Sequence, residues 1–356
     1  MVCSSTEPRP FYFRTFDPPY MSGEINPGLD TAVPVPGATY PGTVSINNDG
    51  IGVPTPIFPK ASVKLWAVQP GTAPSSFPTP TESTTDVTGC TGASPGGGTA
   101  STTYTAPSWG TNSHYCLIAK VKNGIVGVAN DYTNSWDINQ KDDGYLRIAQ
   151  RNVFVVAGGG DSGTPQARKM AFAFAIPNAT PHATNARVVM RAIPDKDERW
   201  AKLIAEDPQL APLLKFGKLA PVDNAGIAIG EERGLRGNVI KLQALRLARS
   251  LKVDLDEVLK GMPREGELGH VGPLSAEEVQ SLVEVPAQPA QALRLSPRET
   301  RQGIVMIEAP KGATPGSFFG VDVRHEGAST EKPNDWRLIG GLVVFLRVPH
   351  PADSKQ

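Results

Sequence analysis

The sequence predicts a mainly β protein with two β-sandwich domains and a helical insertion in the second domain. Three observations support this fold class. Short runs of alternating apolar and polar residues, separated by turn residues, occupy both ends of the chain. The 36 glycines and 34 prolines among 356 residues imply many turns. Helical periodicity is confined to a stretch between the two strand-rich regions.

The first strand-rich region predicts a sandwich over residues 1–157. Strands are expected at Phe11–Phe16, Gly42–Ile46, Val63–Val68, Tyr115–Val121 and Tyr145–Val156. A loop rich in proline, threonine, serine and glycine is expected from about Gly71 to Gly110. Short strands with turns between them are typical of a β-sandwich.

A change in charge density predicts the domain boundary. Only 20 of the first 160 residues are charged, against 50 of the remaining 196. Glycine-rich stretches serve as flexible joints, and Gly158-Gly159-Gly160 begins one here. We therefore expect a linker over residues 158–167 and a second domain over residues 168–356.

The second domain is expected to be a sandwich interrupted by helices at about residues 195–288. Asp195–Phe216 has apolar residues at helical spacing, and Asn238–Lys260 has a broad apolar face rich in leucine. A third short helix is expected to start at Ser275. Strands are expected on both sides of this insertion, at 169–177, 186–193, 292–295, 303–307, 318–323 and 338–348.

Two stretches resemble known bacterial modules. His114–Val121, followed by Ile148–Val153, resembles the last two strands of bacterial immunoglobulin-like adhesion modules of the CARDB type. Val44–Gly50 is similar to a strand and turn of the same modules, and together these stretches span about residues 10–156. Leu295–Arg301 and Pro315-Gly316 resemble the end of fibronectin-III-like bacterial sandwiches. The resemblance implies two immunoglobulin-like β-sandwich domains that bind, space or display, with no catalytic residues to transfer. The long loop and the helical insertion depart from both patterns.

Composition limits the partners and the compartment. Lys+Arg and Asp+Glu balance at 35 each, which disfavours a nucleic-acid-binding field. No apolar run approaches the roughly 18 residues of a spanning helix, so no membrane span is expected. Met1–Ser5 shows no signal peptide, although Cys3-Ser4-Ser5 resembles the start of a processed lipoprotein. The fold analogy favours an extracellular or cell-surface protein.

The candidate chemistry is sparse. Cys90 and Cys116 can close a disulfide if the protein is exported. No cysteine or histidine spacing indicates a metal site, and no cofactor is expected. Asp137–Gly144 approaches a calcium loop but is better read as a hairpin, because Lys141 stands where an oxygen ligand belongs. Gly160–Pro165 resembles the nucleophile segment of trypsin-like proteases, and a flexible joint explains the same residues.

Loop aromatics are the best candidates for binding. Tyr104 and Trp109 lie in the long polar loop, and Tyr132 and Trp136 lie before the closing strand of the first domain. Loops at the end of a sandwich often form recognition surfaces. The leading hypothesis is a non-catalytic bacterial structural or adhesion-type binding protein with a protein partner or self-assembly. The alternatives are a carbohydrate-binding accessory protein that uses these aromatics, and a hydrolase with a site between the insertion and the second sandwich.

Overall fold

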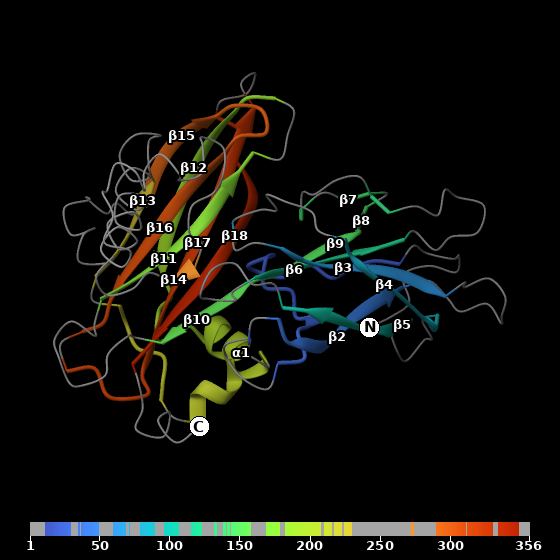
Figure 1. Ribbon diagram of the computed structural model, residues 1–356, viewed down its shortest axis with the longest axis horizontal. Helices are drawn as coiled ribbons and strands as arrows, with labels where there is room; N and C mark the ends of the chain where they lie inside the picture. The colour runs from blue at the N-terminus through green and yellow to red at the C-terminus, as the bar shows by residue number, and fades with distance from the viewer. Residues whose placement is uncertain are drawn as a thin grey trace, which may run out of the picture.

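The computed structural model gives the chain two halves, each built from two facing β-sheets (Figure 1). It describes residues 11–29, 35, 37–49, 60–68, 71, 79–89, 96–106, 115–122, 132–133, 138–139, 141–142, 144–157, 169–178, 182–207, 210–215, 217–222, 224–229, 272–273, 290–310, 312–329 and 334–348. The predicted mainly β fold is confirmed. None of the helices among these residues is long and apolar enough to cross a membrane.

In the described part of the first half, a three-stranded sheet pairs with a four-stranded one. The strand orders are β1-β2-β5 and β4-β3-β6-β9, and every pairing in them is antiparallel. Alternate residues of both sheets, such as Val44 on β2 and Leu65 on β3, meet in one buried cluster. The strands are β1 (Ile25–Asn26), β2 (Thr39–Asn48), β3 (Ala61–Val68), β4 (Thr81–Thr85), β5 (Gly96–Thr105), β6 (Cys116–Val121) and β9 (Ile148–Arg151).

The prediction of a loop from Gly71 to Gly110 is wrong in two places, because the strands β4 and β5 form there. Alternate residues of β5, including Ala100, Thr102 and Tyr104, are buried, as in an ordinary half-buried strand. Threonine is itself favoured in strands. Because β5 is polar in composition, its sequence does not show the alternation of buried and exposed residues that the packed strand has.

The loop before β9 forms the hairpin expected at Asp137–Gly144. Its strands are β7 (Lys141–Asp142) and β8 (Tyr145–Leu146), and they pair antiparallel. Gly144 lies at the turn with φ of +83°, a conformation that glycine adopts without steric cost.

The described residues of the second half form a sandwich of nine strands with sheet orders β10-β18-β17-β12-β15 and β13-β16-β11-β14. Phenylalanines from both sheets, including Phe174 on β11 and Phe345 on β18, fill the space between the sheets. Its strands are β10 (Val153–Ala157), β11 (Lys169–Pro177), β12 (Thr184–Ala192), β13 (Asn224–Ile229), β14 (Gly272–Pro273), β15 (Ala290–Leu295), β16 (Thr300–Glu308), β17 (Phe318–Ser329) and β18 (Arg337–Arg347).

The helical insertion is described at its beginning. An α-helix, α1 (Glu198–Glu206), and a 3-10 helix, η2 (Ala211–Lys215), lie in Asp195–Phe216 as predicted. The predicted helices at Asn238–Lys260 and from Ser275 lie outside the described residues. The structure also places two unpredicted strands, β13 and β14, within the expected helical range 195–288.

The chain passes from one half to the other at Asn152. The expected strand Tyr145–Val156 is interrupted there, because β9 closes the first half while β10 pairs parallel with β18 of the second. The second half therefore takes its first strand from the residues just before the glycine-rich segment.

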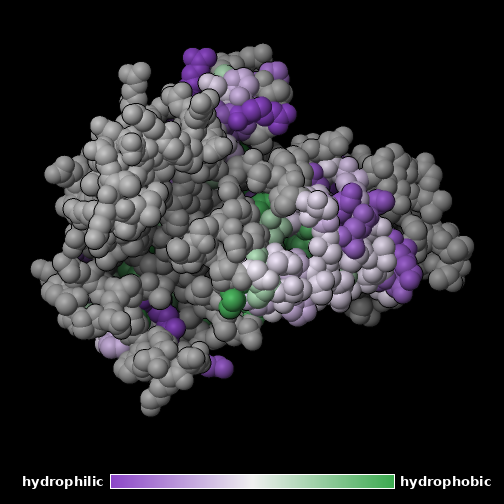
Figure 2. Space-filling view, viewed as in Figure 1, coloured by the Kyte–Doolittle hydropathy of each residue, from purple (hydrophilic) through white to green (hydrophobic). Residues whose placement is uncertain are grey.

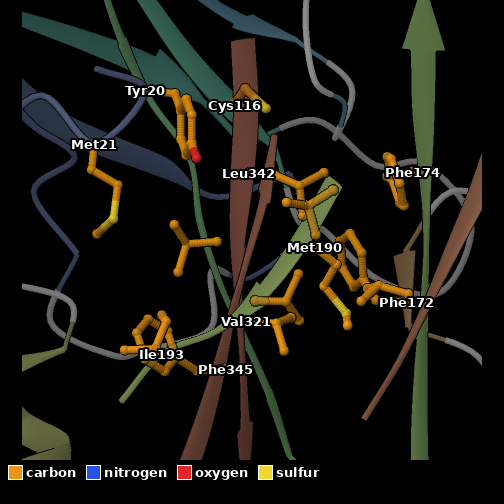
Figure 3. Packing of buried hydrophobic residues seen from close by; sticks show 14 of the residues in the cluster. Tyr20, Met21, Cys116, Phe172, Phe174, Met190, Ile193, Val321, Leu342 and Phe345 are labelled. Carbon is orange, nitrogen blue, oxygen red and sulfur yellow. The ribbon is translucent and has the colours of Figure 1, made fainter. Parts of the chain in front are cut away.

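The two halves share a hydrophobic interior. Leu65 on β3 faces the first sandwich, whereas Trp66 and Val68 belong to the cluster that fills the second. All six residues of β6 are buried for the same reason, since Cys116 and Ile118 point to the second half. Figure 3 shows Tyr20, Met21 and Cys116 beside Leu342 and other residues of the second half. In Figure 2 the described surface of the first half is mostly white to purple, with green, hydrophobic atoms toward the middle of the molecule.

Buried polar groups also cross the junction. The Tyr20 hydroxyl donates to Asp322 on β17, and burial raises the pKa of that phenol well above its ordinary value. The Arg324 Nε atom donates to the same carboxylate at 2.9 Å. The Asn152 amide donates to the carbonyl of Gly341 on β18. Because both polar and apolar contacts tie them together, the halves form one continuous body.

Candidate binding site

Helix α1 is capped at both of its ends. At its start, the Asp197 carboxylate accepts hydrogen bonds from the backbone N–H groups of Arg199 (2.9 Å) and Trp200 (3.3 Å). This is an N-cap, which satisfies amides that have no partner inside the helix. The helix buries Trp200 and Ile204 against the second sandwich. Its end is fixed at Asp207, whose N–H donates to the Leu203 carbonyl at 3.0 Å.

Asp207 fixes the insertion to the first half. Its carboxylate pairs with the guanidinium of Arg151 on β9, and both side chains are only 4% exposed. Its other oxygen accepts the N–H of Leu210 at 3.0 Å, just before η2 begins. One buried carboxylate therefore positions α1, η2 and the end of the first sandwich together.

A pocket of about 470 Å³ lies between this helical pair and the segment that follows it. It is placed where the insertion meets the second sandwich. Two exposed ionisable residues, Asp195 and Lys218, take part in the lining, and the rest is apolar. The apolar lining residues are Ala201, Ile204, Leu214, Leu219, Ala220 and Pro221.

The far wall of the pocket is anchored to β17. Leu219 forms a parallel bridge with Phe318. The Phe318 N–H donates to the Lys218 carbonyl at 3.1 Å, and the Ala220 N–H donates to the Phe318 carbonyl at 2.9 Å. The pocket therefore has a fixed wall on the sandwich and a helical wall held by Asp197 and Asp207.

The pocket residues were not singled out from the sequence. The available signal was the pair of short helices that Pro208 and Pro212 divide, but the charged residues Asp195 and Lys218 lie at opposite ends of that stretch. They come together only because Leu219 docks on β17.

The structure does not bring the four predicted aromatics together as an exposed strip. Tyr104 is 5% exposed, so the expectation that it is exposed is wrong. Its hydroxyl donates to the Pro27 carbonyl at 2.7 Å and lies 2.8 Å from the Tyr115 hydroxyl, and burial raises its pKa to about 12. Trp109 and Trp136 lie outside the described residues.

Tyr132 lies over the outer face of the first sandwich and is half-buried. Its ring centroid is 4.5 Å from Lys64 Nζ and 5.2 Å from Lys122 Nζ, within cation–π range. Its hydroxyl donates to Glu82 at 2.8 Å, and burial together with that carboxylate raises the phenol pKa. These contacts pin Tyr132 to β3 and β4 and gather two ammonium groups around one aromatic ring.

Lys120 adds a third amine on the same face. Its Nζ donates to the Thr133 carbonyl at 2.9 Å and lies 5.9 Å from the ring centroid of Trp66. Burial lowers its pKa to about 8, and Asp142 opposes that shift. Tyr132, Lys64 and Lys122 thus combine aromatic and cationic groups on this outer face, a combination suited to acidic ligands, whereas Lys120 is only 3% exposed.

The described residues contain no group of three or more His, Cys, Asp and Glu side chains that could hold a metal ion. Cys116 carries a free buried thiol that donates to the Gly71 carbonyl at 3.6 Å. Its predicted disulfide partner, Cys90, lies outside the described residues. Burial raises the pKa of the Cys116 thiol to about 12, which keeps it protonated and unreactive.

No protein-family model matches the chain, and no curated protein matches it. Its similar solved structures include CfaE, the adhesive subunit of the CFA/I fimbria of enterotoxigenic Escherichia coli. That likeness has 7% identity and a TM-score of 0.24, and it covers 98% of this chain and 96% of that chain. The collagen adhesin CNA of S. aureus has 7% identity and a TM-score of 0.22, with 91% of each chain covered.

Activated alpha-2-macroglobulin of Escherichia coli is a third similar structure, with 10% identity and a TM-score of 0.23 over 87% of this chain and 21% of that chain.

Proposed function

We propose that the chain is a non-catalytic bacterial structural or adhesion-type binding protein that works at the cell surface within a larger assembly. The observation that carries this proposal is the shared interior of the two halves. Because described residues of both sandwiches pack in that interior, the sandwiches and the insertion pocket keep a fixed geometry relative to one another. Such fixed geometry favours binding, because little order has to be created when a partner docks.

The lining of the pocket supports binding over hydrolysis. Asp195 is its one carboxylate and Lys218 its one amine among the described lining residues. Acid–base hydrolysis of sugars needs two carboxylates, and nucleophilic hydrolysis needs a serine or cysteine beside a base. The apolar lining is instead suited to holding a ligand side chain.

The test is an array experiment with the intact chain. Labelled protein is applied to arrays of extracellular proteins and of glycans, and each array component that binds it is then incubated with the chain and analysed for cleavage. We expect saturable binding without turnover. Turnover of any bound component, or an absence of saturable binding on every array, would overturn the proposal.

A carbohydrate-binding role is the second candidate, and the surroundings of Tyr132 favour it. Lys64 and Lys122 flank the ring, so an acidic glycan would meet two ammonium groups beside an aromatic surface. Glycan binding should then weaken at least tenfold in Lys122→Ala and fall with added salt. Lys202→Ala, on the exposed face of α1, is the matched control and should bind as the native chain does.

A further inference from the structure

In the wall of the pocket beside α1, Leu219 forms an isolated bridge whose own backbone groups are unused on one side. In a parallel bridge, the residue at the centre of one strand turns its own N–H and C=O away from its partner. The two bonds to Phe318 use Lys218 and Ala220, so the N–H and C=O of Leu219 face the opposite side. No described residue bonds to either group.

An edge of this kind accepts an extended peptide. Backbone groups left unpaired at the edge of a sheet pair readily with an added strand. Side chains that lie opposite one another in such a pair stand about 5 Å apart on the same face. Because the Leu219 side chain lines the pocket, the residue paired with Leu219 would also direct its side chain into the pocket.

The size and lining of the pocket define that side chain. About 470 Å³ lies within the range of small ligand pockets and accommodates a leucine, methionine or phenylalanine side chain with part of its backbone. Ile204 and Leu214 provide apolar contacts from α1 and η2. Leu214 is 42% exposed, unusually so for a large hydrophobic residue, and an incoming side chain would cover it.

The charges around the pocket define the neighbouring residues of the peptide. Lys218 and Asp195 are both exposed and line the same pocket. A ligand of one sign would be attracted by one of these residues and repelled by the other. A peptide that carries an acidic residue on one side of its apolar anchor and a basic residue on the other complements both.

We propose that this pocket binds an extended segment of a partner protein, which pairs with the free backbone edge of Leu219 and inserts an apolar side chain flanked by acidic and basic residues. This inference rests on the proposed function, since it names the class of partner. Pro221 has no N–H, so beyond Leu219 it offers an added strand no backbone donor.

The experiment uses the full chain and a phage library of random ten-residue peptides. Selection should enrich sequences with one large apolar residue between charges of opposite sign. In fluorescence polarisation, Leu214→Asp should weaken binding of the selected peptide at least tenfold. Each amide of the selected peptide is then N-methylated in turn. Methylation of the amide that pairs with the Leu219 carbonyl should weaken binding by a similar factor.

Matched controls separate the site from general effects. Val35→Asp places the same charge on an exposed apolar residue of the first half, and Lys215→Glu reverses a charge on η2 that does not line the pocket. Both should bind within twofold of the native chain, whereas Lys218→Glu should lose affinity for the acidic flank. Circular dichroism confirms that each variant is folded.

Two results would overturn the inference. One is a library that yields no peptide able to distinguish the native chain from Leu214→Asp. The other is a selected peptide whose binding no amide methylation weakens. If array binding persists in Leu214→Asp while the peptide experiment fails, the adhesion-type function stands and only the pocket assignment falls.

Discussion

The buried ion pair between Arg151 and Asp207 allows a quantitative test of how the halves are joined. We consider the variant Asp207→Asn, which keeps the shape of the side chain and an oxygen to accept the Leu210 N–H. It leaves the Arg151 guanidinium, 4% exposed, without an opposing charge. Removing one partner of a buried pair typically costs about 3–5 kcal/mol of unfolding free energy.

The assay is urea unfolding followed by tryptophan fluorescence, since Trp200 and Trp66 both lie in the shared interior. The midpoint should fall without a change in the m-value, because the surface exposed on unfolding stays the same. Asp335→Asn is the matched control. Its pair with Arg337 is largely exposed, and such pairs are worth less than about 1 kcal/mol.

A double variant distinguishes two causes of the expected destabilisation. One is the lost attraction between Arg151 and Asp207, and the other is the cost of keeping the Arg151 charge buried without a partner. Arg151→Met combined with Asp207→Leu removes both charges, and apolar replacements of buried pairs are often neutral or stabilising. We expect this variant to recover most of the stability lost in Asp207→Asn. The reasoning is refuted if Asp207→Asn loses no more unfolding free energy than the exposed control Asp335→Asn.

Three further predictions concern the same interior. Gly341→Ala should destabilise the protein by about 1–3 kcal/mol in the same urea assay, because its Cβ would lie 2.3 Å from the Tyr20 ring, and an unchanged midpoint would contradict that packing. Burial lowers the pKa of His325 to about 4, so the unfolded chain takes up a proton at a higher pH than the folded chain does. The free energy of unfolding should therefore fall by up to about 3 kcal/mol as the pH drops from 7 toward 4. His325→Phe should flatten that pH dependence relative to the exposed control His182→Gln, and an equal slope in both would count against a buried neutral imidazole. In a variant whose other two cysteines are serine, a thiol reagent such as DTNB should react with Cys116 only after denaturation, and rapid labelling of the native protein would show that the thiol is accessible.

Much of the fold could be predicted from local pattern. Strands such as β3 and β11 carry strong β-forming residues and sit between turn residues, so their positions follow from the sequence. The start of the insertion was predictable for the same reason, since Trp200 and Ile204 stand at helical spacing. In each case the local signal and the tertiary fold agree.

Other parts depend on tertiary packing. The strand β5 is rich in threonine and glycine, and only its pairing with β2 reveals which of its residues are buried. Tyr104 was expected at the surface for that reason. Trp66 and Ile118 lie on faces that are buried by the other half of the molecule, which no local pattern records.

The candidate pocket is the least predictable feature. Its helical wall follows from the sequence, but its opposite wall exists because Leu219 docks beside Phe318 at the start of β17, far along the chain. A contact of that range has no signature in residue spacing.

The most direct test of the account is whether the halves move as one body in solution. Spin labels at Thr103 on β5 and Lys202 on α1, in a chain whose native cysteines are replaced, report the distance between the two halves by pulsed electron resonance; both positions are exposed. The shared interior predicts a single narrow distance distribution that stays unchanged when the ionic strength is raised. A broad or multimodal distribution would mean that the sandwiches are hinged, and it would contradict the fixed geometry on which the proposed binding function depends.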